Sequence, residues 1–233
     1  MGLTVLMSRT CRPLARWLKY QTYDHRTVPT RIRGLPFVCG PHSRLRPIMP
    51  PERLTIPDLL QRGADHFQAN RLREARDACE QVLRAEPVNP HAAYLLGLIA
   101  HKSGNYADAA RWLRLSVAVG GANPAILNNL GEAYRAQGRL AEALRCFQEG
   151  IRLAPGMAQL HNNCGLACHA LGRVAEAAVH FSEAVRVQPE YAKAHRNLGR
   201  ALQDLGRARE AWACFDRAQA CGQWPENTTA IKQ

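Results

Sequence analysis

Apolar residues recur along most of this chain at helical spacing. Leu127, Leu130 and Tyr134 stand three and four positions apart, and a second stretch continues with Leu144 and Phe147 at the same kind of spacing. Charged and polar residues fill the positions between them. Such spacing is typical of amphipathic helices that bury one face. The pattern therefore predicts an all-α chain made of short helices.

The helical pattern repeats every 34 residues without insertions. Five glycines mark the period, namely Gly63, Gly97, Gly131, Gly165 and Gly199. An alanine follows each of these glycines 12 positions later. Aligned on these glycines, the units span residues 56–89, 90–123, 124–157, 158–191 and 192–225. Such regularity indicates one helix–turn–helix unit stacked five times. We expect the glycine and the alanine to let two helices approach closely while a bulky residue, such as Phe147, fills the remaining space.

Turn residues divide every unit at a constant place. The residue expected just after the first helix is glycine in four units and asparagine in the other: Asn70, Gly104, Gly138, Gly172 and Gly206. Both residue types tolerate the left-handed backbone that often ends a helix. Pro87, Pro155 and Pro189 close three of the units and stop the second helix.

These motifs resemble the tetratricopeptide repeat (TPR), a helix–turn–helix unit of 34 residues. The third unit carries its signature in Leu130-Gly131, Tyr134, Ala143, Phe147 and Pro155. The resemblance extends over all five units and implies a right-handed solenoid of ten helices. It also implies that one face of each first helix lines a concave groove that binds a partner.

The regions outside the repeats are interpreted as a basic, Pro-rich leader over residues 1–55 and a tail over residues 226–233. Residues 1–50 hold nine Lys or Arg and a single acid, Asp24, and so account for most of the net charge of +12. This distribution argues against nucleic-acid binding by the repeats. We predict that the leader is disordered. A mitochondrial presequence and a later start at Met49, which would exclude residues 1–48, are the alternatives.

Cysteine content and hydropathy favour a cytoplasmic protein without a membrane span. The eight cysteines lack the dense arrangement of a small secreted scaffold, and several fall on apolar helix faces. No apolar run approaches the roughly 18 residues that a transmembrane helix needs.

One segment of the fourth unit contains a metal-binding pattern, because His161, Cys164 and Cys168 share a helical face. The same places hold Leu127, Leu130 and Tyr134 one unit earlier, so we interpret the three residues as core and predict neither a metal nor a cofactor. His66, His161, His180 and His195 likewise occupy packing positions. Since no catalytic motif is present, we predict that the chain is not an enzyme.

The candidate binding residues lie on the expected groove face of the first helices. Asparagine recurs before the Leu-Gly place in three units and resembles the asparagine ladder of O-GlcNAc transferases, whereas Gln61 and Leu95 depart from it in the first two. Amides both donate to and accept from a peptide backbone. The predicted groove residues are Asn128, Asn129, Arg135, Asn162, Asn163, His169, Lys193, Arg196, Asn197 and Arg200. The alternative, in which the asparagines only solvate the groove, stays open.

The sequence thus predicts an interaction scaffold that binds a protein or peptide segment in its groove. The cluster of Lys193, Arg196 and Arg200 would favour a segment with Asp, Glu or a free carboxylate. Two alternatives stay open. The repeats could be the substrate-binding arm of a modifying enzyme, similar to O-GlcNAc transferases or TPR-linked sulfotransferases, whose catalytic domain is absent. The last helix, with Phe215 and Trp224, could form a homo-oligomer.

Overall fold

The structure, a computed structural model, describes residues 54–222. The predicted leader, except for its last two residues, and the predicted tail lie outside this part of the chain. The helices are α2 (Ile56–Gln68), α3 (Leu72–Ala85), α4 (Pro90–Lys102), α5 (Tyr106–Gly120), α6 (Pro124–Ala136), α7 (Leu140–Leu153), α8 (Ala158–Ala170), α9 (Val174–Val187), α10 (Ala192–Asp204) and α11 (Ala208–Ala220). Each predicted unit therefore contains two helices.

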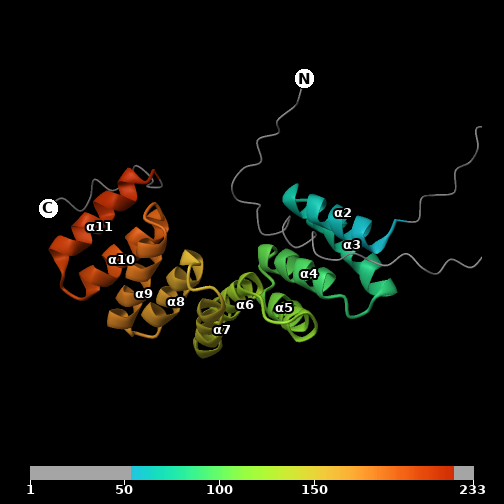
Figure 1. Ribbon diagram of the computed structural model, residues 1–233, viewed down its shortest axis with the longest axis horizontal. Helices are drawn as coiled ribbons and strands as arrows, with labels where there is room; N and C mark the ends of the chain where they lie inside the picture. The colour runs from blue at the N-terminus through green and yellow to red at the C-terminus, as the bar shows by residue number, and fades with distance from the viewer. Residues whose placement is uncertain (1–53, 223–233) are drawn as a thin grey trace, which may run out of the picture. The chain divides into compact units, whose positions relative to one another are not determined.

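The helices stack in chain order, as Figure 1 shows. We call α2, α4, α6, α8 and α10 the first helices and α3, α5, α7, α9 and α11 the second helices. Each first helix packs against the second helix of its own repeat, and that second helix packs against the next first helix. Consecutive first helices also touch, whereas no second helix among residues 54–222 touches the next second helix. The arrangement confirms the predicted all-α solenoid.

The repeated glycine sits where the two helices of a repeat are closest. A Cβ atom added to Gly131 would lie 2.4 Å from Cε1 of Phe147, and one added to Gly165 would lie 2.6 Å from Cε1 of Phe181. Phe147 and Phe181 are 0% and 1% exposed. This confirms the prediction that a large residue on the second helix fills the space left by the glycine on the first helix.

The turns between paired helices adopt the left-handed conformation that the sequence predicts. Asn70 has φ of 60°, and Gly104, Gly138, Gly172 and Gly206 have φ between 75° and 77°. Backbone N–H groups after each first helix bond back to its last turn, as Arg139 does to the Tyr134 carbonyl at 2.9 Å. The left-handed residue thus reverses the chain while the helix end keeps its hydrogen bonds.

The core runs along the stack between the two layers of helices. One buried apolar cluster extends from Ala100 to Ala211, and another joins α2, α3 and α4 around Val82 and Ile99. No helix within residues 54–222 has both the length and the apolar character required to cross a bilayer.

Candidate functional site

The asparagines predicted from the sequence meet across consecutive first helices. The side-chain N–H₂ of Asn163 donates to Oδ1 of Asn128 at 2.9 Å, and that of Asn197 donates to Oδ1 of Asn162 at 2.8 Å. In both contacts, the sixth residue of one first helix reaches the fifth residue of the preceding one. We call this row of contacts the asparagine ladder.

Tyr94 continues the ladder into the second repeat. Its hydroxyl oxygen accepts a hydrogen bond of 3.2 Å from Nδ2 of Asn129, and Tyr94 is the fifth residue of α4. Burial raises the pKa of the Tyr94 phenol, which keeps the hydroxyl protonated at neutral pH. Tyr94 was not predicted from the sequence, although the 34-residue alignment places it level with Asn128 and Asn162.

Asn163 has the most complete set of contacts in the ladder. Besides its bond to Asn128, its N–H₂ donates to Oε1 of Glu132 at 2.8 Å, and its Oδ1 accepts from Nδ2 of Asn162 at 3.3 Å. Asn128, Asn162 and Asn163 are only 4–7% exposed. Buried amides need such partners because an unpaired polar group is costly away from water. These three side chains therefore join the repeats to one another.

Asn129 and Asn197 are the more accessible members of the ladder. Both are half-buried, and each uses one N–H in the ladder. Among the residues that the structure describes, neither Oδ1 atom accepts a hydrogen bond. Each side chain thus retains an acceptor oxygen and a second N–H for a ligand. The contact of these amides with a peptide stays a prediction.

Four of the predicted cations lie on the same helices without an acidic partner. Arg135 is half-buried, and its Nε atom is buried without a hydrogen bond. Arg196 is also half-buried, while Lys193 and Arg200 are exposed. None of the four forms an ion pair with another residue in the range 54–222. Their charges are therefore not neutralised by the described part of the chain.

Arginines at the start of the second helices behave differently. Arg173 pairs with Glu176 at 2.5 Å, Arg207 pairs with Glu210 at 2.7 Å, and Arg139 pairs with Glu142. Each pair joins residues three positions apart within one repeat. Local acids thus neutralise these second-helix arginines, in contrast to the four cations on the first helices.

His169, another predicted groove residue, already has a partner. Its Nε2 lies 2.7 Å from Oδ2 of Asp204, which is 35 residues later, as in the ladder. Two repeats earlier, Nε2 of His101 lies 3.9 Å from Oε2 of Glu132. Asp204 was not predicted from the sequence, because a lone acid at a helix end gives no signal of its partner. His169 therefore takes part in a contact between repeats.

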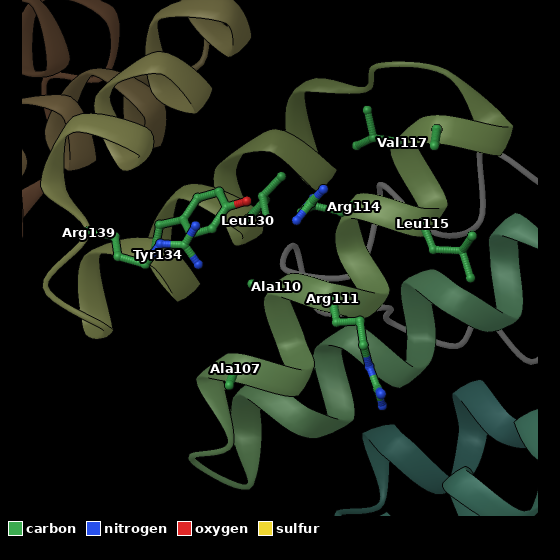
Figure 2. A pocket seen from close by; sticks show the side chains of 10 residues that line it. Ala107, Ala110, Arg111, Arg114, Leu115, Val117, Leu130, Tyr134 and Arg139 are labelled. Atoms are coloured by element: carbon green, nitrogen blue, oxygen red, sulfur yellow. The ribbon is translucent and has the colours of Figure 1, made fainter.

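A separate hollow of about 590 Å³ lies along α5, α6 and the turn before α7, as Figure 2 shows. Its charged lining is mostly compensated. Arg139 stacks on the Tyr134 ring at 4.4 Å and pairs with Glu142, and Arg111 lies 3.0 Å from Asp108. Arg114, the third arginine of the lining, forms no ion pair among the described residues. The cations of α6 and α10 are the stronger candidates for ligand contacts because they lie on the helices that form the asparagine ladder.

Family models match this chain, whereas curated protein sequences do not. One model described as tetratricopeptide repeat matches residues 60–125 and 177–227, and a second model of the same description matches residues 123–190. Together the matches run through all ten helices. A search of curated protein sequences found no match.

Solved structures with a similar fold include MamA and PilF. A crystal structure of MamA has a TM-score of 0.63 at 23% identity, and the match covers 68% of this chain and 93% of that one. The PilF structure of Pseudomonas aeruginosa has a TM-score of 0.67 at 20% identity, covering 73% and 78%. MamA AMB-1 reaches 26% identity with a TM-score of 0.58, covering 70% and 96%.

Proposed function

Because this chain belongs to the tetratricopeptide repeat family, we propose that its first helices bind a segment of a protein partner that carries acidic residues. The fold supports a role in protein interaction in general. The specific proposal concerns the surface formed by Asn129, Arg135, Arg196, Asn197 and Arg200, which we call the ladder face. The proposed role is binding without catalysis.

The observation that carries the proposal is the unneutralised charge beside the ladder. Arg135, Lys193, Arg196 and Arg200 have no acidic partner within residues 54–222, although acids pair with arginines elsewhere on the repeats. A half-buried guanidinium without a partner loses hydration and gains nothing in return. An incoming carboxylate would supply the missing charge and hydrogen bonds, and a guanidinium can hold it through two parallel N–H donors.

The ladder contributes backbone recognition and rigidity. The Oδ1 atoms of Asn129 and Asn197 are available to peptide N–H groups, while the amide nitrogens are held by Tyr94 and Asn162. Side chains already fixed in this way lose less conformational entropy when a ligand binds. The cations would thus select acidic segments, while the amides contact the main chain irrespective of its sequence.

Charge reversal on the full-length chain tests the proposal. The probe is a fluorescent 12-residue peptide rich in glutamate, compared with a glutamine-rich peptide of equal length by fluorescence anisotropy. We expect the acidic peptide to bind more tightly. We also expect Arg196→Glu combined with Arg200→Glu to weaken its binding by about tenfold or more, since charge-assisted contacts contribute about 1.5–3 kcal/mol each.

The same repeat offers a matched control on its other helix. Arg209 and Arg217 are exposed on α11 and form no ion pair among the described residues. Arg209→Glu combined with Arg217→Glu makes the same change in net charge, and we expect it to leave peptide affinity nearly unchanged. Equal losses in both double variants would show only a general charge effect and would contradict the proposed site, as would failure of the acidic peptide to bind.

A further inference from the structure

Two cysteines and a histidine converge inside the fourth repeat. Cys164 and Cys168 stand one turn apart on α8, and His180 reaches them from α9. One ligand atom from each residue lies within 4.8 Å of the other two, and Sγ of Cys164 is 3.5 Å from Nε2 of His180. This cluster differs from the pattern seen in the sequence, because His180 rather than His161 completes it.

A second histidine beside the cluster has an unused nitrogen in a buried setting. The rings of His161 and His180 are 6.4 Å apart between centroids, and His161 is only 6% exposed. Its Nε2 lies 2.9 Å from the Pro155 carbonyl oxygen, to which it must donate. Its Nδ1 therefore carries a lone pair, and this atom is buried without a hydrogen-bond partner.

Packing alone accounts poorly for this group of side chains. The places of Cys164 and Cys168 hold Leu130 and Tyr134 in the third repeat, and the place of His180 holds Cys146. The core needs only apolar residues there, yet the fourth repeat places two thiols and two imidazoles together. An unpaired buried nitrogen such as Nδ1 of His161 is unfavourable unless something binds to it.

We propose that Cys164, Cys168 and His180 bind a zinc-type divalent metal ion through their two sulfur atoms and one imidazole nitrogen. Two thiolates and one or two imidazoles are a common ligand set for tetrahedral Zn²⁺. Zn–S and Zn–N bonds of about 2.3 and 2.0–2.1 Å place sulfur and nitrogen ligands about 3.5 Å apart in a tetrahedron, close to the separation of Cys164 and His180.

Both thiols lie in a buried part of the fourth repeat. Beside them, Nε2 of His161 donates to the Pro155 carbonyl, and His195 makes the same contact of 2.9 Å with Pro189 one repeat later, so this hydrogen bond is a feature of the repeat. Cys164 and Cys168 are both 0% exposed, so water does not stabilise either thiolate. A bound metal would supply the positive charge that stabilises the thiolate.

The metal would join the two helices of the repeat that holds the centre of the ladder. Asn162 and Asn163 precede Cys164 on α8, and His180 lies on α9. Coordination would fix these helices to each other and stabilise the folded chain. The site is therefore proposed as structural, and it does not depend on the proposed peptide binding.

Cobalt binding to the full-length chain, kept reduced, tests the site. Co²⁺ added after chelator treatment should produce a thiolate-to-cobalt charge-transfer band, which saturates at about one ion per chain and disappears when Zn²⁺ is added. Cys168→Ala combined with His180→Ala should abolish the band. These changes copy Ala100 and Ala78, the residues that other repeats of this chain have at the same places.

The matched control is Cys146→Ala, which removes a cysteine of α7 outside the cluster and should keep the band. A native chain without the band would overturn the proposal, as would a band that survives in the double variant, since other thiols such as Cys11 and Cys39 would then be responsible. If the double variant fails to fold, X-ray absorption of the Zn²⁺-loaded native chain decides. About two sulfur neighbours near 2.3 Å would support the site, and any other number would overturn it.

Discussion

The side-chain amide of Asn163 donates a hydrogen bond of 2.9 Å to the side-chain oxygen of Asn128, 35 residues earlier in the chain. The separation is one residue more than the repeat length. Asn197 and Asn162 form the same contact one repeat later, and Asn129 and Tyr94 form its counterpart one repeat earlier. Consecutive first helices are thus joined by one kind of polar contact, placed at the same point of each helix.

Asn163→Ala should destabilise the fold by about 1–3 kcal/mol, because it removes the donor to Asn128 and Glu132 and leaves buried polar atoms unpaired. Urea unfolding followed by circular dichroism measures this loss. Gln148→Ala, at an exposed position of α7, is the control and should change the free energy of unfolding by less than about 0.5 kcal/mol. Equal effects would show that the ladder is not stabilising.

Gly131→Ala should destabilise the fold by about 1–3 kcal/mol. The new methyl group would lie 2.4 Å from the ring of Phe147, which is fully buried and has no room to move. Gly156→Ala is the control, because a Cβ atom there meets nothing within 4 Å and its φ is not in the left-handed range. Thermal unfolding of both variants distinguishes them. A Gly131 variant as stable as the native chain would refute the tight contact.

Gly172→Ala should cost about 1 kcal/mol for a different reason, namely its backbone φ of 75°. A Cβ atom there would meet no neighbour, so only the strain of the left-handed conformation contributes. The reverse change at the equivalent place, Asn70→Gly, relieves a φ of 60° and should not destabilise the chain. Urea titration measures the free energy of unfolding of both variants. A loss of stability in Asn70→Gly would contradict the explanation.

Alkylation should distinguish buried from accessible cysteines in the native chain. Burial raises the pKa of Cys79 to about 12, and its side chain is 0% exposed. Cys221 is only partly buried. Because the thiolate is the reactive form, iodoacetamide at pH 8 should modify Cys221 well before Cys79, as followed by peptide mass spectrometry. Both should react in guanidinium chloride, and equal rates under native conditions would contradict the assignment.

The fold could be predicted from the sequence because its determinants are local and repeated. The spacing of apolar residues indicates helices, the left-handed residues Asn70 and Gly138 separate them, and Gly131 with Phe147 defines how two neighbours pack. Each of these features depends on residues within a single unit. Since every unit repeats the glycine of the first helix and the left-handed residue of the turn, one packing solution applies throughout the stack.

The partners of the polar side chains could not be predicted in the same way. The 34-residue period places Asn128, Asn162 and Tyr94 at equivalent positions, but it does not show that each contacts the next residue of the following first helix. This offset of one residue between the contacting positions depends on how far one repeat rotates against the next when the core packs. The same packing brings His180 of α9 beside Cys164 and Cys168 of α8. Helical spacing on one helix carries no information about a side chain that arrives from another, so these contacts come from the packing of the folded chain.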